Sequence, residues 1–137
     1  MEPTIFDKII AKEIPAEIIY EDDQVVAFLD NQPINPGHTL VVPRQGFVNI
    51  LDGDPDTLAH MMRMAQVIAQ TVCAATQAEG VNVYMNNGAV AGQEVFYCHL
   101  HVVPRHKDDG RFSPPVRSGE AESVKLAKTL RDNLSTV

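Results

Sequence analysis

Cysteines, basic residues and long apolar runs are all scarce in this chain. Only 2 of its 137 residues are cysteines, and Cys73 and Cys98 show no disulfide framework, which favours free thiols in a reducing compartment. Lys and Arg number 11 against 18 Asp and Glu, and a net charge of −7 disfavours binding to a phosphate backbone. No segment approaches the length of a membrane span, and the charged N-terminal stretch lacks a signal-peptide pattern. We therefore expect a cytoplasmic protein with no membrane and no nucleic-acid partner.

Apolar residues make up 45% of the chain, which is enough for one hydrophobic core and too little for two. Helical spacing of these residues predicts helices at 4–12, 56–79 and 120–134, with Gly80 expected to end the second. Strand composition predicts strands at 18–20, 24–29, 38–43, 81–84 and 94–103, the first two forming a hairpin. We expect a single α+β domain over 1–137, with an antiparallel sheet of about five strands, one long packed helix and a short N-terminal helix.

The most informative segment is the predicted strand at 94–103. Successive strand side chains point to opposite faces, so its residues divide into two sets. One set is apolar and forms the expected buried face: Phe96, Cys98, Leu100 and Val102. The other set consists of Tyr97, His99, His101 and Val103. Two imidazoles thus lie side by side on one face, where they predict either catalysis or metal binding.

The same residues resemble a known family. His99-Leu100-His101-Val102-Val103, after Gly92-Gln93, is similar to the second and third histidines of the histidine triad (HIT) motif of nucleotide hydrolases and transferases. Segments 5–10, 12–16 and 21–23 resemble the amino-terminal part of its Hint branch, and segments 27–30 and 36–43 continue the likeness. The resemblance covers residues 4–105 and leaves 106–137 as a tail without a match.

One position departs from the family pattern. A histidine is expected two residues before His99, where this chain has Tyr97. In the family the middle histidine is the nucleophile, which corresponds to His99, and the third corresponds to His101. The first acts largely through its backbone carbonyl, which survives a change of side chain, and the tyrosine hydroxyl offers a further donor. The expected result is chemistry that is reduced or retuned.

The resemblance also assigns roles to further residues. An imidazole whose Nδ1 proton is held by a carbonyl presents Nε2 as a nucleophile, so His99 is expected to form a nucleotidyl-histidine. The phosphate is expected to contact His101, the side-chain amides of Gln93 and Asn86, and the backbone amides of Glu94 and Val95. The nucleoside is expected to contact Ile5, Phe6, Ile9, Phe28 and Leu40 through the purine and Asp30 through the ribose, with His38 behind the site touching Tyr97. The Glu94 carboxylate would repel phosphate unless it turns away, and small hydroxyl residues are frequent there in the family.

Three functions remain open from the sequence. The leading one is a homodimeric purine-nucleotide hydrolase or nucleotidyl transferase for AMP-like or GMP-like compounds, with a phosphoramidate or a dinucleoside polyphosphate such as Ap4A as substrate. The second is a nucleotide-binding or interaction protein in which Tyr97 marks weakened catalysis. The third is a metalloprotein that uses the two histidines, although no third ligand is evident. We predict no cofactor and no metal, because the positions at which some relatives bind zinc through cysteines are Thr4 and Asp7.

Overall fold

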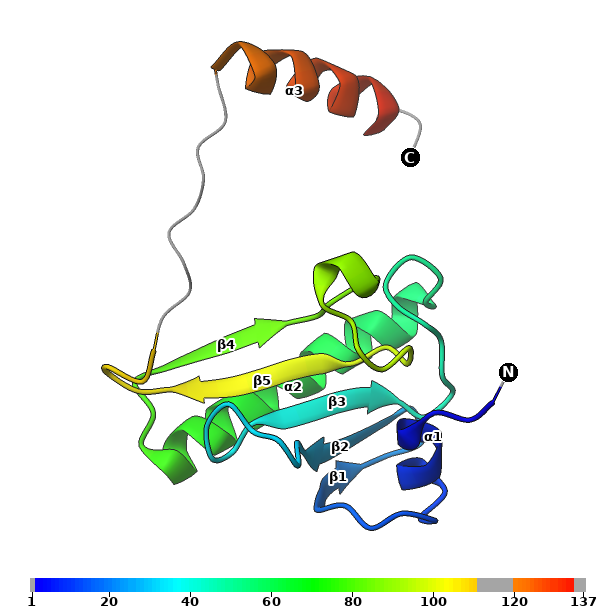
Figure 1. Cartoon of the computed structure of the whole chain (residues 1–137), viewed down its shortest axis with the longest axis vertical. Coiled ribbons are helices and arrows are strands. Elements are labelled where there is room, and N and C mark those ends of the chain that lie inside the picture. Colours follow the sequence, from blue (N-terminus) through cyan, green and yellow to red (C-terminus); the bar gives the residue numbers. More distant parts are fainter. Residues whose placement is uncertain (1, 111–119, 135–137) are drawn as a thin grey trace.

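The structure, a computed structural model, describes residues 2–110 and 120–134. Its centre is a sheet in the strand order β1-β2-β3-β5-β4, in which every neighbouring pair is antiparallel (Figure 1). The strands are β1 (Ile18–Glu21), β2 (Val25–Leu29), β3 (Thr39–Pro43), β4 (Gly80–Tyr84) and β5 (Leu100–Arg105). The predicted α+β class, the five strands and the β1–β2 hairpin are confirmed. The charge, glycine and proline content of 105–119 predicts a loop, of which residues 111–119 lie outside the described residues.

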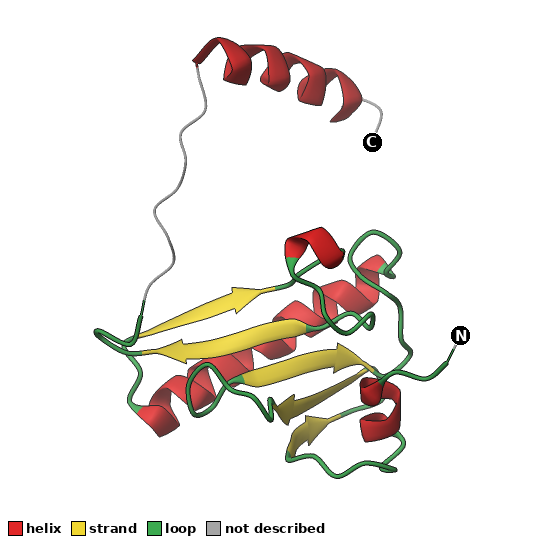
Figure 2. Ribbon diagram, viewed as in Figure 1, coloured by secondary structure: helices red, strands yellow, loops and turns green. Residues whose placement is uncertain are grey.

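The long helix α2 (Pro55–Thr76) covers one face of the sheet (Figure 2). It begins at Asp54, whose side chain accepts a hydrogen bond from the amide of Thr57 at 2.9 Å. Its buried side chains pack on the inward residues of β2, β3 and β5 and on Cys98: Met61, Ala65, Ile68 and Val72. Helical spacing predicts one apolar stripe along this helix, formed by Leu58, Met61, Met62, Ala65, Ile68, Val72 and Ala75. It is confirmed at these four buried positions, whereas Met62 is 52% exposed. Burying each large aliphatic side chain contributes about 1.5–3 kcal/mol, so this layer holds the sheet rigid.

The other face of the sheet is only partly covered. Helix α1 (Ile5–Ile10) lies at the β1–β2 end, and a capping box between Thr4 and Asp7 fixes its first turn. Its Phe6 and Ile9 pack on Phe28, and the same cluster includes Leu40 and Tyr97. Because α1 is short, the rest of this face stays open, and the candidate site lies there.

The strand predicted at 94–103 begins later than expected, at Leu100. β5 pairs with β3 as far as Leu100 with Val41, and continuing that register would bring Cys98 opposite Pro43. Proline has no amide hydrogen to donate, so the ladder stops, and the Cys98 amide instead donates to the Phe47 carbonyl at 2.8 Å. Residues 94–99 therefore form a loop at the end of the strand.

The two faces predicted for this segment are confirmed from Tyr97 onward and wrong before it. Cys98, Leu100 and Val102 face α2, and Tyr97 belongs to the cluster on the opposite face. Phe96, which was expected on the buried face, is 49% exposed. All of these loop residues precede the β5 ladder, but Tyr97 and Cys98 are held by hydrogen bonds to the Pro43 and Phe47 carbonyls, and Phe96 precedes both.

The last helix, α3 (Glu120–Leu134), has the predicted bounds and stands apart from the sheet in Figure 1. Its Val124 and Leu130 are 63% and 50% exposed. No described helix is long and apolar enough to cross a membrane.

The predicted stop of α2 at Gly80 is wrong. The helix ends at Thr76, and Gln77 adopts the left-handed conformation with φ 56° while its amide donates to the Cys73 carbonyl. Gly80 instead opens β4. A glutamine at a left-handed position carries strain that a glycine would not.

We therefore expect Gln77→Gly to raise the free energy of unfolding by about 0.5–1 kcal/mol, since glycine adopts this conformation without a Cβ clash. Urea denaturation would measure the change. Ala78 is the matched control, because its φ is not positive and Ala78→Gly should lower stability. If Gln77→Gly and Ala78→Gly changed the free energy of unfolding in the same direction, this account of the helix end would be contradicted.

Candidate active site

A cleft of about 930 Å³ opens on the face of the sheet opposite α2. Its walls come from α1, the β2–β3 connection, and the segments that flank η1 (Ala89–Ala91). Most residues that the sequence singled out line it: Ile5, Phe6, Ile9, Phe28, Asp30, Leu40, Asn86, Glu94, Val95, His99 and His101. Three do not, namely His38, Gln93 and Tyr97. The size suits a nucleotide-sized ligand.

The orientation of His99 is set by a main-chain group. Its Nδ1 lies 2.6 Å from the carbonyl oxygen of Tyr97, and because a carbonyl only accepts, Nδ1 carries the ring proton. Nε2 is then left with a lone pair. Burial lowers the pKa of His99 below its usual range, although the Tyr97 carbonyl and Asp30 act in the opposite direction. His99 is thus a neutral imidazole with a nucleophilic Nε2 at neutral pH.

His101 is held in the opposite tautomer, with its proton on Nε2, by a hydrogen bond from the neighbouring His38. The Ile34 amide donates to Nδ1 of His38 at 3.0 Å, so the proton of neutral His38 must be on Nε2. That Nε2 lies 2.9 Å from Nδ1 of His101, which therefore accepts. The ring proton of His101 is left on its own Nε2. Burial, with His99 and His38 nearby, lowers the pKa of His101 to about 4, so it is a neutral N–H donor.

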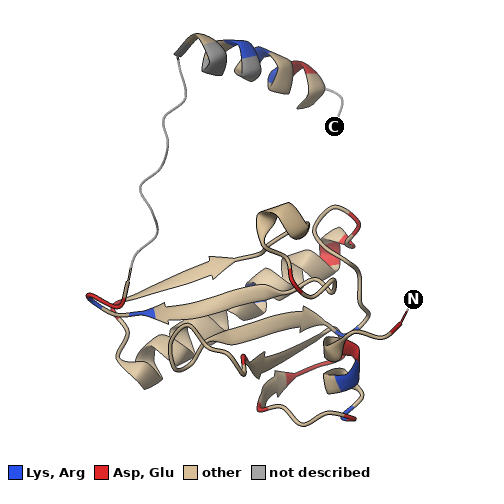
Figure 3. Cartoon of the chain, in the orientation of Figure 1, with Lys and Arg blue, Asp and Glu red and all other residues tan. Residues whose placement is uncertain are grey.

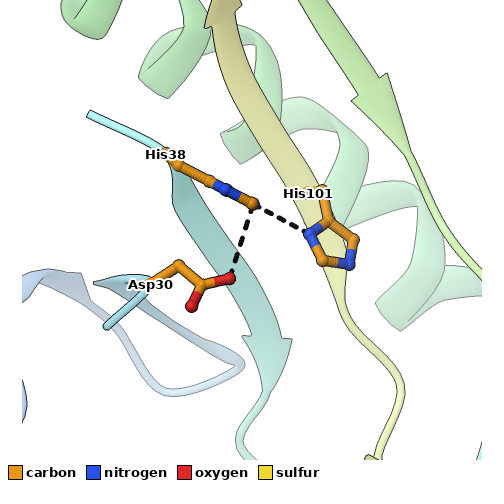
Figure 4. Close-up of side chains that lie close together, drawn as sticks. All are labelled: Asp30, His38 and His101. Carbon is orange, nitrogen blue, oxygen red and sulfur yellow. Dashed lines mark hydrogen bonds and ion pairs between the residues drawn. The ribbon is translucent and has the colours of Figure 1, made fainter. Parts of the chain in front are cut away.

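The contact made by His38 differs from the expected one with Tyr97. Figure 4 shows His38 between Asp30 and His101, and its Nε2 lies 3.6 Å from Oδ2 of Asp30. The sequence also gave no third ligand for a metal, yet one potential ligand atom from each of these three residues lies within 4.8 Å of the others. A metal would need a lone pair on His38 Nε2, which carries the proton as long as Ile34 donates to Nδ1. The arrangement fits a hydrogen-bonded chain better than a metal centre.

Tyr84 is a cleft residue that sequence reasoning missed. It ends β4 and pairs directly with His101 across the two strands. The two rings stack with centroids 4.5 Å apart and an interplanar angle of 10°. The stacking fixes the imidazole plane from the side opposite His38. Only the β4–β5 register brings these residues together, and the sequence alone does not give that register.

Gln93 was expected to bind phosphate, but its side chain is used inside the protein. It is buried, and its Nε2 donates to the carbonyls of Val48 at 2.7 Å and Val95 at 3.2 Å. Its Oε1 accepts from the Gly88 amide at 2.8 Å. These bonds tie the η1 loop to the segment before His99. Gln93 therefore holds the cleft wall in place and does not itself line the cleft.

The Tyr97 hydroxyl likewise points away from the cleft. It donates to the carbonyl of Pro43 and lies 3.3 Å from that of Arg44, and burial raises its pKa. Its ring fills the space beside Gly46, where an added Cβ would lie 2.4 Å from a ring carbon. The side chain thus anchors the loop after β3 to the segment before His99. Its backbone carbonyl remains available to orient the nucleophile.

The lowered histidine pKa values predict that the protein loses stability in mild acid. The pKa values of His38, His99 and His101 lie below the unfolded value near 6.5, so the unfolded chain binds more protons below that pH. Their contribution is complete above pH 6.5 and is lost as the pH falls toward the folded pKa values. Urea denaturation between pH 7 and 5 measures the loss.

The variant His101→Gln separates this effect from the titration of carboxylates. Between pH 6 and 5, its free energy of unfolding should fall less steeply than that of the wild type, by about 1 kcal/mol per pH unit. Equal slopes in the two proteins would mean that His101 is not held neutral in the folded state.

Comparison with known proteins agrees with this geometry. Residues 11–108 match the HIT domain family. An uncharacterised HIT-like protein of Methanocaldococcus jannaschii is 41% identical over 128 residues, covering 93% of this chain and 96% of that protein. The adenylylsulfatase HINT3 of Arabidopsis thaliana is 33% identical over 133 residues, covering 97% of this chain and 66% of that protein. The solved histidine triad nucleotide-binding protein of Candida albicans has a TM-score of 0.86 at 28% identity, covering 98% of this chain and 99% of that one. The chain therefore belongs to the HIT domain family and has HINT-like proteins among its relatives.

Proposed function

We propose that this protein hydrolyses or transfers purine nucleotides through a covalent nucleotidyl intermediate on His99. The observation that carries the proposal is the 2.6 Å contact of His99 Nδ1 with the Tyr97 carbonyl, which leaves Nε2 as a lone-pair nucleophile inside the cleft. The relatives support the same chemical class. HINT3 of Arabidopsis is an adenylylsulfatase, and the Candida protein is described as nucleotide-binding.

The nucleoside end of the cleft suits a purine and a ribose. Phe6 and Phe28 meet edge to face with centroids 5.4 Å apart, and they line an apolar slot with Ile9 and Leu40. Asp30 lies beside the slot, and its Oδ1 accepts from the Gln32 amide at 2.9 Å. The carboxylate keeps further lone pairs with which to accept two ribose hydroxyls. Apolar walls accept adenine and guanine alike.

The phosphate end suits in-line attack. His101 offers its Nε2–H, Asn86 offers a side-chain amide, and the Glu94 and Val95 amides complete the expected set of donors. The His99 Nε2 lone pair forms a bond to the α-phosphorus while the bond to the leaving atom breaks and its electron pair goes to that atom. An amine leaving group takes one proton from solvent. Water then attacks the phosphorus, the P–N bond to His99 breaks, and one proton returns to solvent.

Turnover of an adenosine phosphoramidate tests the proposal. We expect His99→Ala to lower kcat/KM by about 10³-fold or more while AMP still binds, because the nucleophile is lost and the slot is unchanged. Tyr97→Phe keeps the backbone carbonyl, so it should retain activity within about tenfold and lose about 1 kcal/mol of stability with its hydroxyl hydrogen bond.

Tyr97→His is the complementary variant, because it restores the family residue but removes the anchor to the loop after β3. If the wild type turns over no faster than His99→Ala while both bind AMP, the enzyme proposal is wrong. The protein would then be a nucleotide-binding module.

We also propose that the protein is a homodimer, paired through α2 and β4. Both elements expose apolar side chains to solvent: Met62 (52%), Val67 (47%), Val81 (38%) and Val83 (37%). Such a surface favours a two-fold contact in which the same patch is buried on each copy.

Sedimentation should therefore give about twice the chain mass of 15.1 kDa. Val67→Glu should shift the equilibrium toward the single chain, because it would bury a charge in the contact. A wild-type species of 15.1 kDa would contradict the dimer.

A further inference from the structure

We propose that Glu94 selects the leaving group, favouring a cationic amine over an anionic group such as sulfate or a phosphate chain. The inference rests on the proposed function and identifies a class of substrate for it. It depends on the charge of the cleft, the position of Glu94 and the state of the two histidines.

Among the described residues, the cleft is lined by carboxylates and by no Lys or Arg side chain. Glu17, Asp30 and Glu94 line it, whereas no Lys or Arg of the described chain does. In Figure 3 the strands in the middle of the sheet are largely uncharged, and the blue position on β5 lies at its end. Arg105, the one cation of β5, is directed to Asp109 at 2.8 Å. The described cleft thus has no fixed cation for a chain of phosphates.

The catalytic histidines do not supply the missing charge. The pKa of His101 is about 4 and that of His99 is also lowered, so both rings are neutral at pH 7. One phosphoryl group can be bound by neutral N–H donors. Several adjacent phosphates or a sulfate develop negative charge on departure, and the described residues of the cleft offer no opposite charge to stabilise it.

The proposed function places the Glu94 backbone amide at the phosphate, and Glu94 lines the cleft together with His99 and His101. The side chain of Gln93, the preceding residue, accepts from the Gly88 amide and donates to the Val95 carbonyl, so the backbone is fixed on both sides of Glu94. Its side chain is exposed to the cleft solvent and has no hydrogen bond or ion pair with any other described residue. The carboxylate is therefore available to a group that leaves from the phosphorus.

An amine leaving group makes use of this carboxylate. When the P–N bond breaks, the nitrogen keeps the electron pair and takes one proton, so it departs as a neutral amine, and a second proton from solvent then makes it an ammonium ion. A nearby carboxylate stabilises that charge and any second ammonium on the same group. It opposes a group that leaves as an anion. At an exposed site this discrimination is about tenfold and weakens with salt.

Three AMP phosphoramidates of similar size test the proposal, made from ethylenediamine (cationic tail), n-propylamine (neutral tail) and glycine (anionic tail). The wild type should show the highest kcat/KM for the first and the lowest for the third. Glu94→Gln should reduce the ratio of cationic to anionic substrate by about tenfold, and Glu94→Ser should do the same. Raising the salt should shrink the wild-type ratio and leave that of Glu94→Gln nearly constant.

Glu17→Gln is the matched control, since Glu17 lines the same cleft and its carbonyl accepts from the Leu29 amide, next to Phe28 of the apolar slot. It should change all three substrates alike, because they share the adenosine. If the ratio of kcat/KM for the cationic substrate to that for the anionic one stayed within twofold of wild type in both Glu94 variants, the role of Glu94 would be overturned. The proposed function would remain intact. A wild type inactive on all three substrates would reject the proposed function itself.

Discussion

The chemistry of this site depends on two main-chain groups that fix the protons of two histidines. The Tyr97 carbonyl accepts a hydrogen bond from His99 Nδ1–H, which keeps the ring proton of His99 on Nδ1. The Ile34 amide donates to His38 Nδ1, so His38 donates from Nε2 to His101 Nδ1 and the ring proton of His101 is on Nε2. One ring is left with a lone pair and the other with a donor, as attack on a phosphorus requires. Since both groups belong to the backbone, the assignment does not depend on the side chain at position 97. A tyrosine there is compatible with an oriented nucleophile.

The fold positions these groups because β5 begins late, at Leu100. β5 loses its partner where Pro43 has no amide hydrogen, and the preceding residues turn so that the Tyr97 carbonyl faces the His99 ring. Tyr97 and Gln93 then hold that turn, one against the loop after β3 and the other against the η1 loop. The packing of α2 on the far face makes the sheet a rigid base for both. Buried side chains that resembled ligand contacts thus serve to position the backbone.

The sequence was sufficient for patterns that are local. The hairpin, the α2 stripe and the alternation from Tyr97 onward follow from spacing along the chain, whereas most cleft residues were expected from the resemblance to the HIT family. Contacts between distant segments were not predictable. The stacking of Tyr84 depends on the β4–β5 register, and the partner of His38 depends on where the β2–β3 loop folds back. The end of α2 was misjudged because Gln77 adopts the left-handed conformation, which residue preferences would assign to a glycine.

The same hydrogen bonds limit which reactions the cleft can support. His101 cannot act as a full acid at neutral pH, because its pKa is about 4 and losing its only proton would leave an anionic ring. It can stabilise a phosphoryl oxygen, but the proton for the leaving atom must come from elsewhere. An amine that is protonated as it leaves meets this requirement with solvent alone. A cleft with neutral histidines, three carboxylates and no described Lys or Arg is therefore consistent with leaving groups that depart as neutral amines and then become ammonium ions, and the role proposed for Glu94 follows the same logic.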